Sequence, residues 1–154
     1  MSNHTPKIRA YTDSDWSEWL RLSAALFPDD ASEELIADMR NFVARADGQV
    51  IVAVRADGRL AGFVEVGARS VADGCVTSPV GYIEAWFVDP DVRRQGLGLA
   101  LLAAAEGWAR QCGYREIASD ALIDNVVSHA AHRRAGYEEV DRVVEFRKVL
   151  GPLG

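Results

Sequence analysis

The sequence predicts a single mixed α/β domain, and three observations carry that prediction. The chain has 154 residues, the length of one ordinary domain with one sizeable core. Its composition, 49% apolar and 26% charged, is that of a globular protein and not of a disordered or fibrous chain. Helix-like and strand-like segments alternate along it without a linker, an internal repeat or a low-complexity stretch. We therefore expect residues 1–154 to form one unit.

A strand followed by two helices is expected at the start of the chain. Residues 7–11 form a candidate strand, and the polar cluster 13–15 supplies side chains suited to capping a helix that ends at Pro28. Asp30 and Glu33 have the spacing of a capping box. The apolar residues after them recur with helical period, so a second helix is expected to run to about Arg45.

Three strands are expected next. Residues 49–54 and 60–66 are rich in β-branched and aromatic side chains, and Asp57-Gly58 between them favours a tight turn, so they predict a hairpin. Residues 80–88 are almost continuously apolar, as in a central strand that is buried on both faces. Glu84 is the one acidic residue inside this stretch.

The rest of the chain predicts two more helices and further strands. Residues 99–108 predict an Ala-rich helix, and residues 116–119 a short strand. A last helix is expected to follow a cap at Asp124 or Asn125. Residues 137–150 alternate loosely enough for one long strand or two short ones. The whole order predicts a sheet flanked by about four helices.

Charge and composition restrict the possible functions. The chain carries 23 acidic and 17 basic residues, a formal net charge of -6, which argues against a nucleic-acid-binding protein and favours a cationic partner. Cys75 and Cys112 have neither CxxC spacing nor paired histidines nearby, so we expect free thiols and no metal site. The first residues lack the apolar core of a signal peptide, and no apolar run approaches the roughly 20 residues that span a bilayer. We expect a cytoplasmic protein that does not bind membranes.

The segment 88–100 is the most informative, because an apolar strand runs through a glycine turn directly into a helix. Free backbone N–H groups and the helix dipole make a helix start attractive to anions, and Gly96 and Gly98 would let a phosphate approach the backbone. Arg93 and Arg94 add positive charge. The spacing matches neither a dinucleotide fingerprint nor a P-loop. The segment therefore predicts an anion site, with a tight turn carrying incidental arginines as the simpler alternative.

The six residues from Arg93 to Gly98 resemble the R/Q-x-x-G-x-G/A pyrophosphate loop of the GCN5-related N-acetyltransferases (GNAT), whose element order the chain shares. The resemblance covers most of the chain. It implies the GNAT fold, in which a mixed, mostly antiparallel sheet has a splay between its two central strands, and acetyl-coenzyme A (acetyl-CoA) as donor. The residues that it implies in donor binding are Trp86, Phe87, Val88, Arg93, Arg94, Gln95, Gly96, Leu97, Gly98, Leu99 and Asn125.

Each part of that donor site has an implied role. The backbone amides of residues 94–99 are implied to bind the pyrophosphate, and residues 86–88 to pair with the pantetheine arm. Asn125, at the start of the last helix, is implied to contact the pantetheine. An ordinary helix cap is the alternative for Asn125, and the two roles are compatible.

Residues 77–84, 118–121, 124–129 and 132–139 show a narrower resemblance, to the aminoglycoside 6'-N-acetyltransferases of the small dimeric branch. It implies an aminoglycoside or another polyamine as acceptor, and a homodimer whose C-terminal strands pair or exchange. General GNAT members usually have a tyrosine four residues before the glycine of the last helix, as proton donor to the coenzyme A thiolate. Here His132 stands in that place, as in the aminoglycoside branch, so the general acid stays open.

Glu84, Asp120 and His132 are the candidates for catalysis. An acid in an apolar strand is costly unless it is paired or functional, and burial would raise its pKa toward the range of a base. Glu84 is therefore expected to take the proton of the acceptor amine, directly or through a water. A structural glutamate bonded to a neighbouring loop is the alternative. Asp120 ends a predicted strand where ligand crevices of open α/β sheets lie, although a turn aspartate would look the same.

The narrower resemblance also implies an acceptor wall. Phe27 stands where the resembled enzymes have a tryptophan that stacks on the sugar, and Val71 stands where they have a substrate-contacting tyrosine. Asp141 aligns with a further substrate-facing acid, in addition to Glu84 and Asp120. A solvated acidic face that includes Glu138, Glu139 and Glu145 is the alternative. Several carboxylates together would attract a polyamine.

The sequence therefore predicts direct transfer of acetyl to an aminoglycoside 6'-amine. Neither cysteine lies in the expected site, so an acyl-enzyme is not expected. Two alternatives stay open: an acetyltransferase that acts on another small amine or a peptide amino terminus, and a non-catalytic acetyl-CoA-binding protein.

Overall fold

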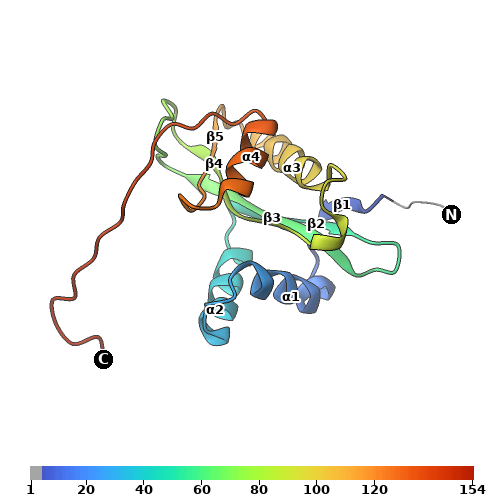
Figure 1. Ribbon diagram of the computed structural model, residues 1–154, viewed down its shortest axis with the longest axis horizontal. Helices are drawn as coiled ribbons and strands as arrows, with labels where there is room; N and C mark the ends of the chain where they lie inside the picture. Colours follow the sequence, from blue (N-terminus) through green and yellow to red (C-terminus); the bar gives the residue numbers. More distant parts are fainter. Residues whose placement is uncertain (1–4) are drawn as a thin grey trace.

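The computed structural model describes residues 5–154 as a five-stranded sheet with helices on both faces (Figure 1). The fold is the expected mixed α/β arrangement with four helices. In spatial order the strands are β1 (Lys7–Ala10), β2 (Gly48–Val54), β3 (Leu60–Arg69), β4 (Val80–Val88) and β5 (Ile117–Ser119). The helices are α1 (Trp16–Leu26), α2 (Ser32–Val43), α3 (Leu97–Gln111) and α4 (Val126–Arg134), with short 3-10 turns η1 (Asp13–Asp15) and η2 (Pro90–Val92).

The sheet is antiparallel except between β4 and β5, which run parallel. β5 pairs with β4 only through residues 81–83, whereas β4 continues to Val88. Within the described chain, the edge of β4 beyond Ile83 therefore has no strand beside it. This is the expected splay, and it leaves backbone hydrogen-bonding groups of β4 available to a ligand.

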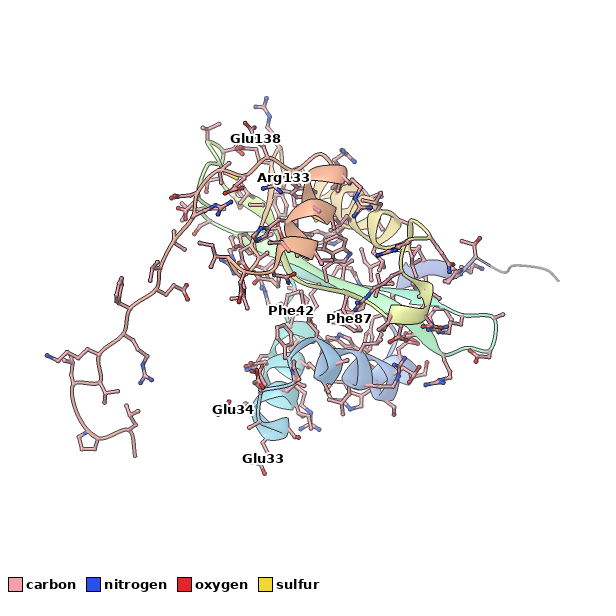
Figure 2. All side chains as sticks on the ribbon, in the orientation of Figure 1. Glu33, Glu34, Phe42, Phe87, Arg133 and Glu138 are labelled. Atoms are coloured by element: carbon pink, nitrogen blue, oxygen red, sulfur yellow. The ribbon has the colours of Figure 1, made fainter. Side chains whose placement is uncertain are left out.

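Two hydrophobic cores flank the sheet, because successive strand residues point to opposite faces. α1 and α2 cover one face, where Trp19 packs edge-on against Phe63 of β3 (Figure 1). α3 and α4 lie on the other face, where Leu101 and Leu102 of α3 are fully buried. Figure 2 shows Phe42 at the end of α2 next to the sheet.

A β-bulge in β4 decides which face each of its residues meets. Glu65 of β3 lies opposite Ala85, but the next residue, Val66, lies opposite Ile83, so Glu84 is the extra residue. The bulge changes the alternation: Ile83 belongs to the α3 core, whereas Ala85 belongs to the core under α1 and α2.

Residues 80–88 are not buried on both faces along their whole length, contrary to the expectation. The strand is largely buried up to Ala85, but Trp86, Phe87 and Val88 are only partly buried. The reason is the splay, since β5 has already ended at Ser119 and no longer covers this end of β4.

The expected strands between residues 137 and 150 are absent. The chain from residue 138 onward has no regular secondary structure and leads away from the sheet (Figure 1). A strand is stable only beside another strand that satisfies its backbone groups. This segment has no such neighbour in the described chain.

Two expected helix caps are also wrong. α2 begins after Ala31, and neither Asp30 nor another side chain caps it. The side chain of Asp15 does not cap α1 but accepts hydrogen bonds from Arg9 at 2.7 Å and from the backbone of Thr12 at 2.9 Å. Asp15 is thus used for contacts that helix periodicity does not reveal. In the described part of the chain, no helix is both long and apolar enough to cross a membrane.

Candidate active site

The turn between η2 and α3 presents a row of outward backbone N–H groups. Arg94 and Gly96 both have left-handed backbone conformations, with φ of 63° and 80°. The first hydrogen bond of α3 runs from the backbone of Ala100 to that of Gly96 at 3.0 Å. Among residues 5–154, no acceptor is found for the backbone amides of residues 94–99. Such successive amides at the start of a long helix suit a pyrophosphate group.

The two glycines of this turn have different roles. A Cβ atom at Gly96 would meet nothing within 4 Å, so a left-handed backbone conformation is what favours glycine there. A Cβ atom at Gly98 would lie 3.0 Å from the indole ring of Trp86, whose Nε1 donates to the Gly98 carbonyl at 3.1 Å. Gly98 therefore lets α3 pack closely on β4. The expectation from the sequence is that Gly98 lets a phosphate approach the backbone, whereas the structure shows a need for glycine in this packing.

The end of β4 is tied to the turn by Arg93. Its Nε donates to the carbonyl of Val88 at 2.9 Å, and its guanidinium lies 5.4 Å from the centre of the Phe87 ring. One lone pair of the Val88 carbonyl is thus already used. Arg94 is exposed and extends the positive charge of the turn.

A charge network that the sequence reasoning missed anchors the same turn. Asp89, which is 8% exposed, accepts hydrogen bonds from Arg21 of α1 at 2.9 Å and from Arg55 at 3.0 Å. Arg55 also binds both carboxylate oxygens of Asp91 at 2.8 Å. The hydrogen bonds to Asp89 and Glu18 raise the pKa of Arg21. The donor turn is therefore clamped to α1 and to the β2–β3 hairpin.

Glu84 is paired with Arg69, and this differs from the desolvated acid that the sequence predicted. Arg69 donates to both oxygens of Glu84, at 2.8 and 2.7 Å. The Glu84 side chain is 22% exposed. The bulge places Glu84 on the α1–α2 face, where it lines a hollow. Each carboxylate oxygen has a further lone pair that is not used by Arg69 and can accept from a ligand.

Asp120 lies directly after β5, as expected, and is linked to Glu84 through two intermediate side chains. The hydroxyl of Tyr82 donates a short hydrogen bond to Asp120. The guanidinium carbon of Arg69 lies 3.5 Å from the centre of the Tyr82 ring. Burial, together with the hydrogen bond to Asp120, raises the pKa of Tyr82. Tyr82 and Arg69 are site residues that the sequence reasoning missed.

His132 lies on the opposite face of the sheet from Glu84, between the rings of Trp86 and Tyr137. Its Nδ1 donates to the carbonyl of Ser128 at 2.7 Å, because a carbonyl can only accept. Its Nε2 lies 2.8 Å from the hydroxyl of Ser119 and therefore accepts from it in the neutral ring. His132 thus holds α4 against the end of β5 and orients the Ser119 hydroxyl.

An acidic hollow of about 330 Å³ lies between the α1–α2 layer and the sheet. Phe27 and Glu84, both expected at the acceptor site, line it together. Glu65 is a further lining residue that sequence reasoning missed. Burial raises the pKa of Glu65 to about 7, and the charge of Glu84 adds to the rise. The whole lining consists of Ser23, Phe27, Asp30, Leu35, Asp38, Met39, Phe42, Arg45, Glu65 and Glu84.

Of the residues expected at the acceptor site, Val71, Asp120 and Asp141 do not line this hollow. Val71 is 76% exposed in the loop before β4. Asp141 is exposed in the C-terminal segment, where its carboxylate accepts from the backbone of Arg142. Asn125 is the cap of α4 and accepts from the backbone of Ser128 at 3.2 Å. The cap role of Asn125 is therefore confirmed, while contact with pantetheine stays a prediction.

The last features to place are possible metal-ligating groups and the two cysteines. Within residues 5–154, no group of three or more His, Cys, Asp or Glu side chains is placed to hold a metal ion. Cys75 and Cys112 are both free, as expected.

The chain belongs to the Acetyltransferase (GNAT) family, because the sequence model of that family matches residues 14–137. Two relatives show the narrower similarity. The aminoglycoside N(6')-acetyltransferase type 1 of Stenotrophomonas maltophilia is 43% identical over 153 residues, which cover 99% of each chain. The enzyme of the same name from Klebsiella aerogenes is 40% identical over 150 residues, 95% of this chain and 98% of that one.

Solved structures agree with this assignment. The aminoglycoside antibiotic 6'-N-acetyltransferase of Acinetobacter haemolyticus, in its apo form, superposes with a TM-score of 0.87 at 34% identity and covers 94% of this chain and 99% of its own. AAC(6')-Iy in complex with the bisubstrate analog CoA-S-monomethyl-acetylneamine has a TM-score of 0.87 at 31% identity, with 95% and 99% covered. The expected family and fold are thereby confirmed.

Proposed function

We propose that this protein transfers the acetyl group of acetyl-CoA to the 6'-amine of aminoglycosides. The carrying observation is the position of the acidic hollow, which reaches Glu84 on β4, the strand whose free edge leads to the amide-lined turn of residues 94–99. One strand thus joins an anion site to a cation site. The names of the relatives, and the analog bound by AAC(6')-Iy, support the same donor and acceptor.

The donor half of the proposed mechanism uses backbone groups. The amides of residues 94–99 bind the pyrophosphate, with Arg94 adding charge at the rim. The free edge of β4 beyond Ile83 pairs with the pantetheine arm, and Asn125 reaches it from the start of α4. Arg93 keeps the turn in place through its bond to Val88.

The acceptor half uses carboxylates. An aminoglycoside amine arrives protonated, and Glu84 takes one proton from it, directly or through a water, so that the nitrogen becomes nucleophilic. The new N–C bond forms as the C–S bond breaks, and a water molecule takes the second proton from the nitrogen. Arg69 holds the Glu84 carboxylate in a fixed orientation, and Asp120 attracts the other ammonium groups.

The thiolate that leaves must be protonated. We place His132 in this step, because it holds the hydroxyl of Ser119 at the residue where β4 and β5 part. In the imidazolium form of His132, Nε2 donates to the Ser119 oxygen while the Ser119 hydroxyl donates to the thiolate, and the ring returns to its neutral form.

A thiol-release assay with acetyl-CoA tests the proposed function. Neomycin and paromomycin form a matched pair, since the first has an amine and the second a hydroxyl at the 6' position. We expect turnover of neomycin, tobramycin and kanamycin and none at the 6' position of paromomycin. Absence of turnover with every 6'-amino compound would rule out the proposed acceptor. Turnover of a small amine or a peptide amino terminus instead would support another acetyltransferase, and tight acetyl-CoA binding without any turnover would support a binding protein.

We also propose that the protein acts as a homodimer in the cytoplasm, where acetyl-CoA is formed. Support for the dimer comes from the segment after residue 137, which carries apolar side chains and packs on no strand. Val144 is 74% exposed and Phe146 is 92% exposed. A second copy of the chain offers such a segment a strand edge with which to pair.

A further inference from the structure

The acidic hollow contains a second carboxylate that the acetyl transfer does not use. Glu65 of β3 lines the hollow next to Glu84 of β4. Glu65 faces the α1–α2 layer by the regular alternation of β3, and Glu84, the extra residue of the bulge in β4, lies on the same face. Neighbouring strands lie about 5 Å apart, so the two carboxylates stand beside each other on the sheet side of the hollow. Glu65 is one strand farther from the splay than Glu84.

Two buried polar atoms near Glu65 have no hydrogen-bond partner within residues 5–154. They are Oγ of Ser23 and Nε1 of Trp19. Ser23 is 1% exposed and lines the hollow, while Trp19 is fully buried. Buried polar atoms are nearly always hydrogen-bonded in folded proteins. The unpartnered hydroxyl of Ser23 therefore marks a place where a ligand completes the bonding.

The charges around Glu65 define what that ligand is. Glu84 and Asp38 raise the pKa of Glu65 in addition to its burial, so negative charge accumulates at this point. Asp30 adds a further carboxylate to the lining, and Arg45 is the one Arg or Lys side chain among the lining residues. A group that brings a positive charge and several N–H donors offsets this repulsion. An ammonium group has both properties.

We propose that Glu65 and Ser23 bind a second amino group of the acceptor, on the same sugar ring as the amine that is acetylated. This inference rests on the proposed function. Glu84 takes the reacting amine, while the neighbouring ammonium group donates to Glu65 and to Oγ of Ser23. A hydroxyl in that position brings no positive charge. The site therefore selects diamino sugars over the corresponding amino-hydroxy sugars.

Kanamycin A and kanamycin B test the proposal, because both have the 6'-amine and they differ only in a 2'-hydroxyl and a 2'-amine. We expect the wild-type KM for kanamycin B to be roughly tenfold lower than for kanamycin A. Glu65→Gln should bring the two KM values within about twofold of each other, mainly by raising that for kanamycin B. Its kcat for kanamycin A should stay near the wild-type value. Ser23→Ala should reduce the preference by a smaller factor, since it removes one acceptor and no charge.

Asp30→Asn is the matched control, because it removes one charge at the exposed rim of the same hollow. It should raise KM for both compounds by the same factor. A wild-type preference for kanamycin B that persists in Glu65→Gln and Ser23→Ala would overturn the proposal. So would acetylation of both compounds without preference by the wild type, whereas acetylation of neither contradicts the proposed function itself. Calorimetric binding of the two compounds repeats the comparison without turnover.

Discussion

Glu84 shows how a single residue changes meaning once its neighbours are known. In the sequence it is an isolated acid within an apolar strand, and that position suggests a buried base. In the structure the side chain is partly exposed, and Arg69 donates one hydrogen bond to each of its carboxylate oxygens. The carboxylate is thereby held in one orientation. This suits proton transfer from a cationic amine, which approaches from the acidic hollow.

Glu84→Gln should lower kcat by about 100-fold or more, because the amide cannot accept the proton of the amine. The affinity for acetyl-CoA should stay within about twofold, since residues 94–99 lie beyond the end of β4 at Val88 and bind through their own backbone amides. Steady-state kinetics and acetyl-CoA titration measure both quantities. Glu33→Gln serves as the control, since Glu33 lies on α2 away from the sheet (Figure 2). Wild-type turnover by Glu84→Gln would remove Glu84 from the proposed mechanism.

The buried position of Glu65 predicts a pH-dependent stability. Its pKa is about 7 in the folded protein and 4.5 ordinarily, so between these pH values the unfolded chain has lost the proton that the folded protein keeps. The free energy of unfolding should therefore fall as the pH rises from about 4.5 to about 7, by about 3 kcal/mol from this group. Urea unfolding at pH 5 and pH 8 should show that Glu65→Gln loses this decrease while Glu33→Gln keeps it. Equal pH dependence in both variants would contradict the assignment.

At the scale of elements, the contact between α3 and β4 positions the donor turn. Gly98 lies against Trp86, and Trp86 in turn packs against His132 of α4. The network of Asp89 with Arg21 and Arg55 fixes the other side of the turn. Side chains outside the segment 93–98 thus hold both sides of the donor turn.

Gly98→Ala should destabilise the protein by about 1–3 kcal/mol, because the added methyl group overlaps the Trp86 ring. The start of α3 must then shift, so the affinity for acetyl-CoA should fall severalfold. Gly107→Ala is the matched control in the same helix: nothing lies within 4 Å of its Cβ position, and alanine favours the helix by about 0.5–1 kcal/mol. Urea unfolding and acetyl-CoA titration measure the effects. The prediction is wrong if Gly98→Ala is as stable as Gly107→Ala.

At the scale of the whole molecule, the segment after residue 137 pairs with no strand within residues 5–154, and its first residues contact α4, through Glu139 and Arg133, and the loop at Gly74, through Val140. In a strand, alternate side chains share one face, so Val144 and Phe146 would lie on the same face of a strand formed on pairing with a second copy. Both are exposed. Burying them against a second copy would stabilise a dimer, since a fully buried side chain of this size contributes about 1.5–3 kcal/mol.

The double change Val144→Asp and Phe146→Asp should therefore convert a dimer to a monomer, as measured by size-exclusion chromatography with light scattering. The changes Glu145→Ser and Arg147→Ser alter the alternate side chains of the same segment and should leave the dimer intact. A wild-type protein that is monomeric at micromolar concentration, or a dimer that survives both aspartates, would contradict the proposal.

The sequence by itself determined most elements of the fold and the donor turn, because these follow from local patterns. The periodicity of apolar residues defines α1, α2 and β4, and a strand that runs through glycines into a helix defines the turn at Gly96. What only the tertiary structure decided depends on residues far apart in the chain. The pairing of Arg69 with Glu84 and the bulge that brings Glu65 beside Glu84 arise from the register between β3 and β4. Strand register is a long-range property, so the acceptor hollow, unlike the donor turn, appears only when the strands are paired.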